Sequence, residues 1–152
     1  MFRGVNTLTL DTKGRMAMPT RYRDRVIELS EGKLVVTIDT DERCLLLYTL
    51  PDWEQIERKL DALPSFNAQA RRIQRLLMGH ATDVEMDGNG RVLLPPPLRE
   101  YAGLDKHVVL IGQGKKFELW DEQLWNASRD QWLGQETGEG GELPAELLSL
   151  SL

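Results

Sequence analysis

The chain has 152 residues, of which 41% are hydrophobic and 28% are charged, a composition typical of globular proteins rather than disordered ones. This length suits one domain, or two small halves that share a core. No stretch approaches the roughly 18 apolar residues of a membrane span. The first residues lack the apolar core of a signal peptide, and the single cysteine excludes an internal disulfide. We therefore expect a cytoplasmic protein with no membrane partner.

The net charge of −5 is spread unevenly along the chain. Residues 134–152 contain four glutamates and no lysine or arginine, whereas residues 1–25 carry a charge of +4. The basic side chains of this first segment are Arg3, Lys13, Arg15, Arg21, Arg23 and Arg25. Because binding responds to the local field, an acidic chain with one basic segment remains compatible with a nucleic-acid partner.

The first third of the chain predicts a hairpin, a helix, two more strands and a closing helix. In the hairpin turn, Asp11 can accept local backbone hydrogen bonds and Gly14 permits a positive φ. Pro19 then ends the second strand and opens the helix. The predicted strands cover 7–10, 15–18, 34–39 and 44–48, and the helices run from 19 to about 29 and from 51 to about 60. The buried face of the first helix is expected to hold Tyr22, Val26 and Leu29.

A middle helix and a second set of the same elements follow. The middle helix is expected over 65–78, with Ser65 as its cap and with Phe66, Ala70, Ile73 and Leu77 along one side. The later strands are expected at 84–87, 91–94, 108–112 and 116–120, and the later helices at 96–102 and 121–133.

The run LDTKGRMAMP at 10–19 returns as MDGNGRVLLP at 86–95. An offset of 76 residues aligns the paired positions Asp11 and Asp87, Gly14 and Gly90, Arg15 and Arg91, Pro19 and Pro95, and Arg23 and Arg99. Two similar units of about 45 residues therefore flank the middle helix. We divide the chain into a first repeat at 1–63, a linking helix at 64–81, a second repeat at 82–133 and an acidic, mobile tail at 134–152.

Two such units cannot each bury both faces of a small sheet. Packing them about a pseudo-two-fold axis would close the sheet and remove its open edges. The predicted fold class is mainly β with flanking helices (α+β), an internally duplicated barrel.

The first turn is the better candidate for a DNA contact. A two-stranded ribbon can enter the major groove, and an arginine at its tip can pair with O6 and N7 of guanine. We assign this role to Arg15, in the turn that Gly14 shapes, and we assign phosphate contacts to the nearby basic side chains. Those side chains are Lys13, Arg3, Arg21 and Arg25. The alternatives are a solvated turn and an ordinary solvated helix face.

The second turn, with Asp87, Gly90 and Arg91, is the weaker candidate. Asn89 replaces the lysine of the first turn, and residues 83–103 carry a charge of −2. Arg91 is expected to brace its own turn or a neighbouring subunit.

Enzyme interpretations fail on specific residues, so we predict no catalytic residues, no cofactor and no metal site. Asp11 and Asp87 lack the Asp-Thr/Ser-Gly context of paired aspartic-protease carboxylates. The run at 112–115 lacks the spacing of a phosphate-binding loop. His80 and His107 have no spaced Cys or His partners.

Two further features concern assembly. Arg71, Arg72 and Arg75 on the middle helix can contact nucleic acid or, as we favour, an acidic face of a neighbouring subunit. The tryptophans fall in or beside the terminal helices of the two units, which fits core or subunit contact. They are Trp53, Trp120, Trp125 and Trp132.

Six runs stand out in chain order: MFRG at the start, LDTKGR, CLLLY at 44–48, RRIQRLLMGHA at 71–81, MDGNGR and KFELWDE at 116–122. Together they resemble the MraZ family of bacterial transcriptional regulators. The resemblance covers roughly residues 1–133 and implies an AbrB-like swapped-hairpin β-barrel. It implies a ring of about eight or more subunits. It also implies repression of the protein's own division and cell-wall gene cluster through tandem G-rich repeats in double-stranded promoter DNA, and hence a place at the nucleoid.

Within that resemblance, the DNA-contacting turn corresponds to Asp11, Lys13, Gly14 and Arg15. Asn89 breaks the pattern in the second copy. The alternative function is a ring-forming protein-interaction scaffold without specific DNA binding. RNA binding is less favoured, because no aromatic residue flanks the basic turn to stack on a base.

Overall fold

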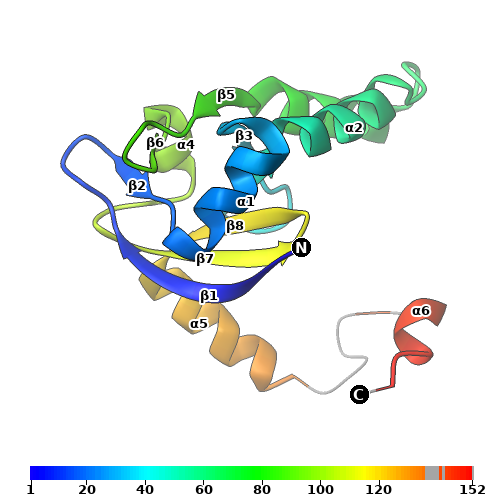
Figure 1. The fold of residues 1–152 in the computed structure, drawn as a ribbon. Coiled ribbons are helices and arrows are strands. Elements are labelled where there is room, and N and C mark those ends of the chain that lie inside the picture. Colours follow the sequence, from blue (N-terminus) through cyan, green and yellow to red (C-terminus); the bar gives the residue numbers. More distant parts are fainter. Residues whose placement is uncertain (136–140, 142, 152) are drawn as a thin grey trace. The chain divides into compact units, whose positions relative to one another are not determined.

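The computed structural model describes residues 1–135, 141 and 143–151, and it contains two compact units, Met1–Glu122 and Gln123–Leu152. In the first unit (Figure 1) the strands are β1 Phe2–Thr9, β2 Arg15–Ala17, β3 Lys33–Ile38, β4 Leu45–Thr49, β5 Thr82–Glu85, β6 Arg91–Leu93, β7 His107–Gly114 and β8 Lys116–Asp121. The helices are α1 Thr20–Ser30, α2 Leu50–Asp61, α3 Ala68–Ile73, the π-helix η1 Gln74–Met78 and α4 Pro96–Tyr101.

Six strands form one antiparallel sheet in the order β1-β7-β8-β4-β3-β5, and β2 and β6 form a separate two-stranded sheet. The α+β class is therefore confirmed, with helices flanking an antiparallel sheet. Closure of the strands into a barrel stays a prediction.

The expected pairing of each hairpin was wrong. Strand β1 pairs along its whole length with β7 of the other half, β5 pairs with β3, and β2 pairs with β6. Each turn is still closed locally, since the Asp11 N–H donates to the Arg15 carbonyl and the Asp87 N–H donates to the Arg91 carbonyl. Beyond the turns the strands separate, because pairing across the halves buries Met16 and Val92 opposite each other. The two halves are therefore interleaved.

The central strands β3 and β4 are buried on both faces. On one face Leu34, Val36 and Leu47 join a core that also contains side chains of β2, β6, α1 and α4. On the other face Val35, Leu46 and Tyr48 pack with Trp53 and Leu60 of α2, and with the partly buried Ile73, Leu77 and Met78 of α3 and η1. This double burial explains why these strands are continuously apolar rather than alternating.

The buried stripe of α1 differs from the expectation. Tyr22 and Val26 are buried, but the third buried position is Ser30, whose Oγ donates to the Val26 carbonyl at 3.0 Å. Leu29 is 38% exposed. Positions 22, 26 and 30 follow an i, i+4, i+8 line along the helix, and residue 29 lies off that line.

The middle helix begins later than expected. Asn67, not Ser65, caps α3 by accepting the Ala70 N–H at 2.9 Å, and Phe66 lies before the helix and is 99% exposed. The helix then widens into η1, where the Thr37 hydroxyl donates to the Leu77 carbonyl at 2.7 Å. The Leu77 carbonyl thus receives a side-chain donor from β3 in the turn where the helix is wider.

The second unit contains most of α5, Glu122–Leu133, and α6, Ala145–Leu148. Trp125 and Trp132 of α5 contact each other edge to face, with ring centroids 6.0 Å apart. Of the predicted mobile tail, residues 136–140, 142 and 152 lie outside the described part, and the remainder includes α6. Among the described residues, no helix combines the length and apolarity needed to cross a bilayer.

Candidate nucleic-acid interface

The two repeated turns have the same hydrogen-bond geometry. In the first, Asp11 Oδ1 accepts the backbone N–H groups of Lys13 and Arg15, both at 2.9 Å, and the Asp11 carbonyl accepts the Gly14 N–H at 3.0 Å. Gly14 has a φ of +83°, in the left-handed region that favours glycine. One carboxylate therefore fixes the path of the chain from residue 11 to residue 15.

The second turn repeats these bonds. Asp87 Oδ1 accepts the N–H groups of Asn89 and Arg91 at 2.9 Å each, the Asp87 carbonyl accepts the Gly90 N–H at 2.9 Å, and Gly90 has a φ of +76°. The repeat seen in the sequence is therefore a repeat of backbone structure.

The two arginine side chains differ in how closely they are held. Arg15 Nε donates to Asp11 Oδ2 at 2.6 Å, whereas Arg91 Nε lies 3.4 Å from Asp87 Oδ2 and is buried without a hydrogen-bond partner among the described residues. The Arg15 backbone N–H, together with its guanidinium, lowers the pKa of Asp11 to about 2, against the opposing effect of desolvation. The pKa of Asp87 is also lowered, chiefly by the Arg91 backbone N–H and in small part by the charge of Arg15.

The short ladder between β2 and β6 holds the two turns together. Met16 lies opposite Val92, and both are fully buried. At its ends, the Leu94 N–H donates to the Gly14 carbonyl at 3.2 Å and the Met18 N–H donates to the Gly90 carbonyl at 2.8 Å. The turns are therefore fixed to each other, and both lie at the left of Figure 1.

Each turn is also covered by an arginine from the other half. The Arg99 guanidinium lies against Gly14 and its Nε donates to the Leu94 carbonyl at 3.2 Å. Arg23 lies against Gly90, and its Nε donates to the Met18 carbonyl at 2.7 Å. The sequence repeat pairs Arg23 with Arg99 but does not by itself predict that each covers the turn of the other half.

The other predicted phosphate contacts form a group of their own. Arg21 is exposed, donates to the Asn6 side chain and lies over the Tyr22 ring at 4.8 Å, while the Tyr22 hydroxyl donates to the Arg3 carbonyl at 2.6 Å. Arg25, one helical turn further, pairs with Glu28 at 3.2 Å. The structure places Arg21 against Gly4 and Asn6 on one face of β1, whereas Arg3, at the alternate position of the strand, belongs to the other face. The first turn follows Thr9, the last residue of this strand.

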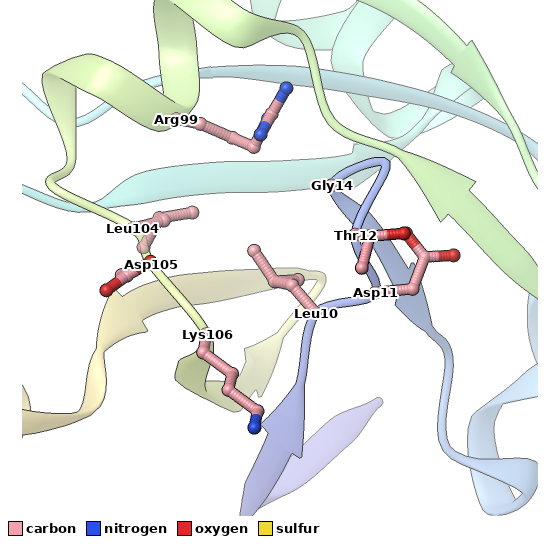
Figure 2. Close-up of a pocket in the computed structure, with 8 residues that line it drawn as sticks. All are labelled: Leu10, Asp11, Thr12, Gly14, Arg99, Leu104, Asp105 and Lys106. Atoms are coloured by element: carbon pink, nitrogen blue, oxygen red, sulfur yellow. The ribbon is translucent and has the colours of Figure 1, made fainter.

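The surroundings of the two turns differ in charge. A pocket of about 370 Å³ beside the first turn has Arg99 and Lys106 balanced by Asp11 and Asp105. Figure 2 shows the Arg99 side chain extending toward the segment that carries Gly14. The Lys106 amine lies on the side of the pocket opposite Arg99. The corresponding pocket of about 260 Å³ beside the second turn sets one arginine against three carboxylates. Those residues are Arg23, Asp24, Glu31 and Asp87. The first turn is therefore the less acidic of the two, and its exposed residue 13 is a lysine.

Comparison with known proteins agrees with this architecture. The family model described as "MraZ protein, putative antitoxin-like" matches residues 1–76 and again residues 77–136.

The chain belongs to the MraZ family.

Relatives of equal length carry the name "Transcriptional regulator MraZ". The chain is 63% identical to the one from Thioalkalivibrio sulfidiphilus (strain HL-EbGR7), and 60% identical to those from Coxiella burnetii (strain RSA 493 / Nine Mile phase I) and Legionella pneumophila (strain Corby). Each comparison covers 152 residues, which is 100% of both chains. MraZ is therefore a family of regulators by name rather than of enzymes, as the sequence predicts.

Proposed function

We propose that this MraZ family member is a sequence-specific double-stranded DNA-binding transcriptional regulator, and that its first turn reads the bases. The observation that carries the proposal is the fixed Arg15 guanidinium beside an exposed Lys13, in the less acidic of two equivalent turns. The names of its relatives support the same function.

The geometry of Arg15 suits recognition of guanine. Asp11 engages Nε, and among the described residues the two terminal nitrogens of this guanidinium make no hydrogen bond. These nitrogens are the donors that pair with guanine O6 and N7. Because Asp11 already restrains the side chain, less rotamer freedom is lost on binding.

Phosphate contacts would set the register. Lys13 at the same turn is a point charge suited to one phosphate. Arg3 lies near the start of β1, Arg21 lies beside Gly4 and Asn6 of the same strand, and Arg25 is one helical turn beyond Arg21. In this arrangement they hold the backbone on the other side of the groove. Asp87, Gly90 and Arg91 act as the structural counterpart of the reading turn.

We assign an assembled form to the regulator. A closed ring of about eight or more copies presents identical turns around one rim, so that tandem G-rich promoter repeats meet successive subunits. Side chains available for subunit contacts include Val5, Ile27 and Leu93, each more than half exposed. Weak contacts at each turn then add up to tight repression of the protein's own division and cell-wall gene cluster, in the cytoplasm at the nucleoid.

Fluorescence anisotropy tests the function. Purified protein is titrated against a duplex from upstream of its own gene and against a scrambled duplex, at several salt concentrations. The proposal predicts selective binding to the promoter duplex that weakens steeply as salt rises, because phosphate contacts release counterions. Equal and weak binding to both duplexes would contradict it and favour the alternative, a ring-forming protein scaffold.

A further inference from the structure

Three side chains with metal-binding atoms meet at one end of the central strands, beside the connection between β3 and β4. Asp39 follows β3, Cys44 precedes β4, and Glu118 lies within β8. One carboxylate oxygen from each acid and Cys44 Sγ all lie within 4.8 Å of one another. We propose that Asp39, Cys44 and Glu118 form a site for a zinc-class divalent cation, a role independent of DNA binding.

The sheet itself positions the three ligands. The Asp39 N–H donates to the Cys44 carbonyl at 3.0 Å, so these residues face each other across the turn between β3 and β4. Glu118 is paired with Leu46, two residues after Cys44. Since side chains two residues apart point to the same face of a strand, and paired residues share a face, the three groups lie on one face of the sheet.

The burial of Cys44 points to a ligand. The thiol is fully buried, and among the described residues it makes no hydrogen bond, although two carboxylates lie beside it. Burial, and then the charges of Glu118 and Asp39, raise the pKa of Cys44, while Lys116 opposes them. The same two carboxylates also raise the pKa of Tyr48, after the larger effect of burial. The site therefore places two carboxylates beside a buried sulfur atom that has no hydrogen-bond partner in the described part of the chain.

The arrangement fits zinc better than harder cations. Thiolate favours zinc-class ions over magnesium or calcium, and three protein ligands leave one position for water. Around a tetrahedral zinc ion, neighbouring ligand atoms lie about 3.3–3.8 Å apart, given metal–ligand distances of about 2.0–2.3 Å. Shifts of about 1 Å or less would therefore bring the three side chains into coordination. Asp39 and Glu118 are only partly buried, which leaves an entry path from solvent.

Binding would replace the thiol proton with the metal ion. The sulfur–hydrogen bond breaks, a sulfur–metal bond forms, and one proton leaves to solvent for each ion bound. The present partners of the two carboxylates are compatible with coordination, because Asp39 Oδ2 accepts the Glu42 N–H and Glu118 Oε1 accepts the Trp120 ring N–H.

The experiment uses Cd²⁺ as the probe, since Cys44 is the only cysteine of the chain and any thiolate-to-cadmium absorption band must come from it. The full-length protein is titrated with Cd²⁺ and the ultraviolet charge-transfer band is recorded, together with proton release in weak buffer. Zn²⁺ is then added as a competitor. We expect one ion and about one proton per chain, and loss of the band as Zn²⁺ displaces Cd²⁺.

Variants separate a three-ligand site from a lone thiol. Cys44→Ser should abolish the band, and Asp39→Asn and Glu118→Gln, which preserve size and their existing hydrogen bonds, should each weaken Cd²⁺ binding at least tenfold. Asp41→Asn, an exposed change in the same turn, is the matched control and should leave the affinity unaltered. Circular dichroism checks that every variant is folded. Absence of a band in the folded parent protein, or a band insensitive to both carboxylate changes, would overturn the proposal.

Discussion

Replacing Gly14 with alanine should destabilise the protein more than the same replacement of Gly88 in the second turn. The φ of +83° at Gly14 places an L side chain in the left-handed region, which costs about 1–2 kcal/mol. The added Cβ would also collide with the Arg99 guanidinium and displace it from the Leu94 carbonyl, a hydrogen bond worth about 1 kcal/mol. Together these effects predict a loss of about 2–3 kcal/mol in the free energy of unfolding.

The matched control is Gly88→Ala in the second turn. Gly88 does not have a positive φ, and a Cβ there meets nothing within 4 Å. Its free energy of unfolding should change by about 0.5 kcal/mol or less. Urea unfolding followed by tryptophan fluorescence measures both variants, provided the slope with denaturant is unchanged.

A double-mutant cycle separates the two contributions. In an Arg99→Ala background the collision is absent, so Gly14→Ala should cost about 1 kcal/mol less than it does in the parent protein. The same cost for Gly14→Ala and Gly88→Ala would refute the reasoning about the turn. If Gly14→Ala cost the same in the Arg99→Ala background as in the parent protein, only the contribution assigned to the Arg99 contact would be refuted.

Three further predictions follow from the same geometry. Lys13→Ala should weaken binding to promoter and scrambled duplexes alike, and should reduce the slope of log affinity against log salt by about one, as measured by anisotropy. A loss of affinity confined to the promoter duplex would contradict a phosphate contact. Because the pKa of Asp11 is lowered from 3.8 to about 2, folding favours its ionised form. This contribution to stability should be complete above pH 4 and be lost as the pH falls toward 2. In urea unfolding from pH 5 to 2, the free energy of unfolding should depend less on pH in Asp11→Asn than in the parent protein. Leu47→Ala should lower the free energy of unfolding by about 2–5 kcal/mol in the same assay, since Leu47 is fully buried between paired strands; a loss below 1 kcal/mol would place it outside the core.

Local sequence signals predicted the elements well where burial was uniform. Continuous apolar runs predict β3, β4 and β7, and the partly alternating run KFELWD predicts β8. Strand β3 pairs with β4, and β7 pairs with β8, as their short connections suggest. The prediction of strand pairing failed where the duplicated chain offers two equivalent partners for one strand. The turn at 11–14 looks like a hairpin turn by every local criterion, yet its flanking strands pair with β7 and β6.

The site shows the same division. The repeat predicted both Asp-x-x-Gly-Arg turns, because their geometry depends on residues within five positions of each other. The sequence of the turns alone does not predict that Arg99 and Arg23 cover Gly14 and Gly90, since each arginine reaches its glycine only because strands are exchanged between the halves. The cluster of Asp39, Cys44 and Glu118 gave no sequence signal, because Glu118 lies far along the chain from the other two.

The central claim is that Arg15, rather than its repeat counterpart Arg91, reads the DNA sequence. The direct measurement is the ratio of affinities for promoter and scrambled duplexes in Arg15→Ala and in Arg91→Ala, which remove the same group from equivalent turns. The account predicts that Arg15→Ala lowers this ratio by about 5- to 150-fold for each contact, corresponding to about 1–3 kcal/mol, while Arg91→Ala changes it by about twofold or less. An unchanged ratio in Arg15→Ala, or an equal loss in Arg91→Ala, would contradict it.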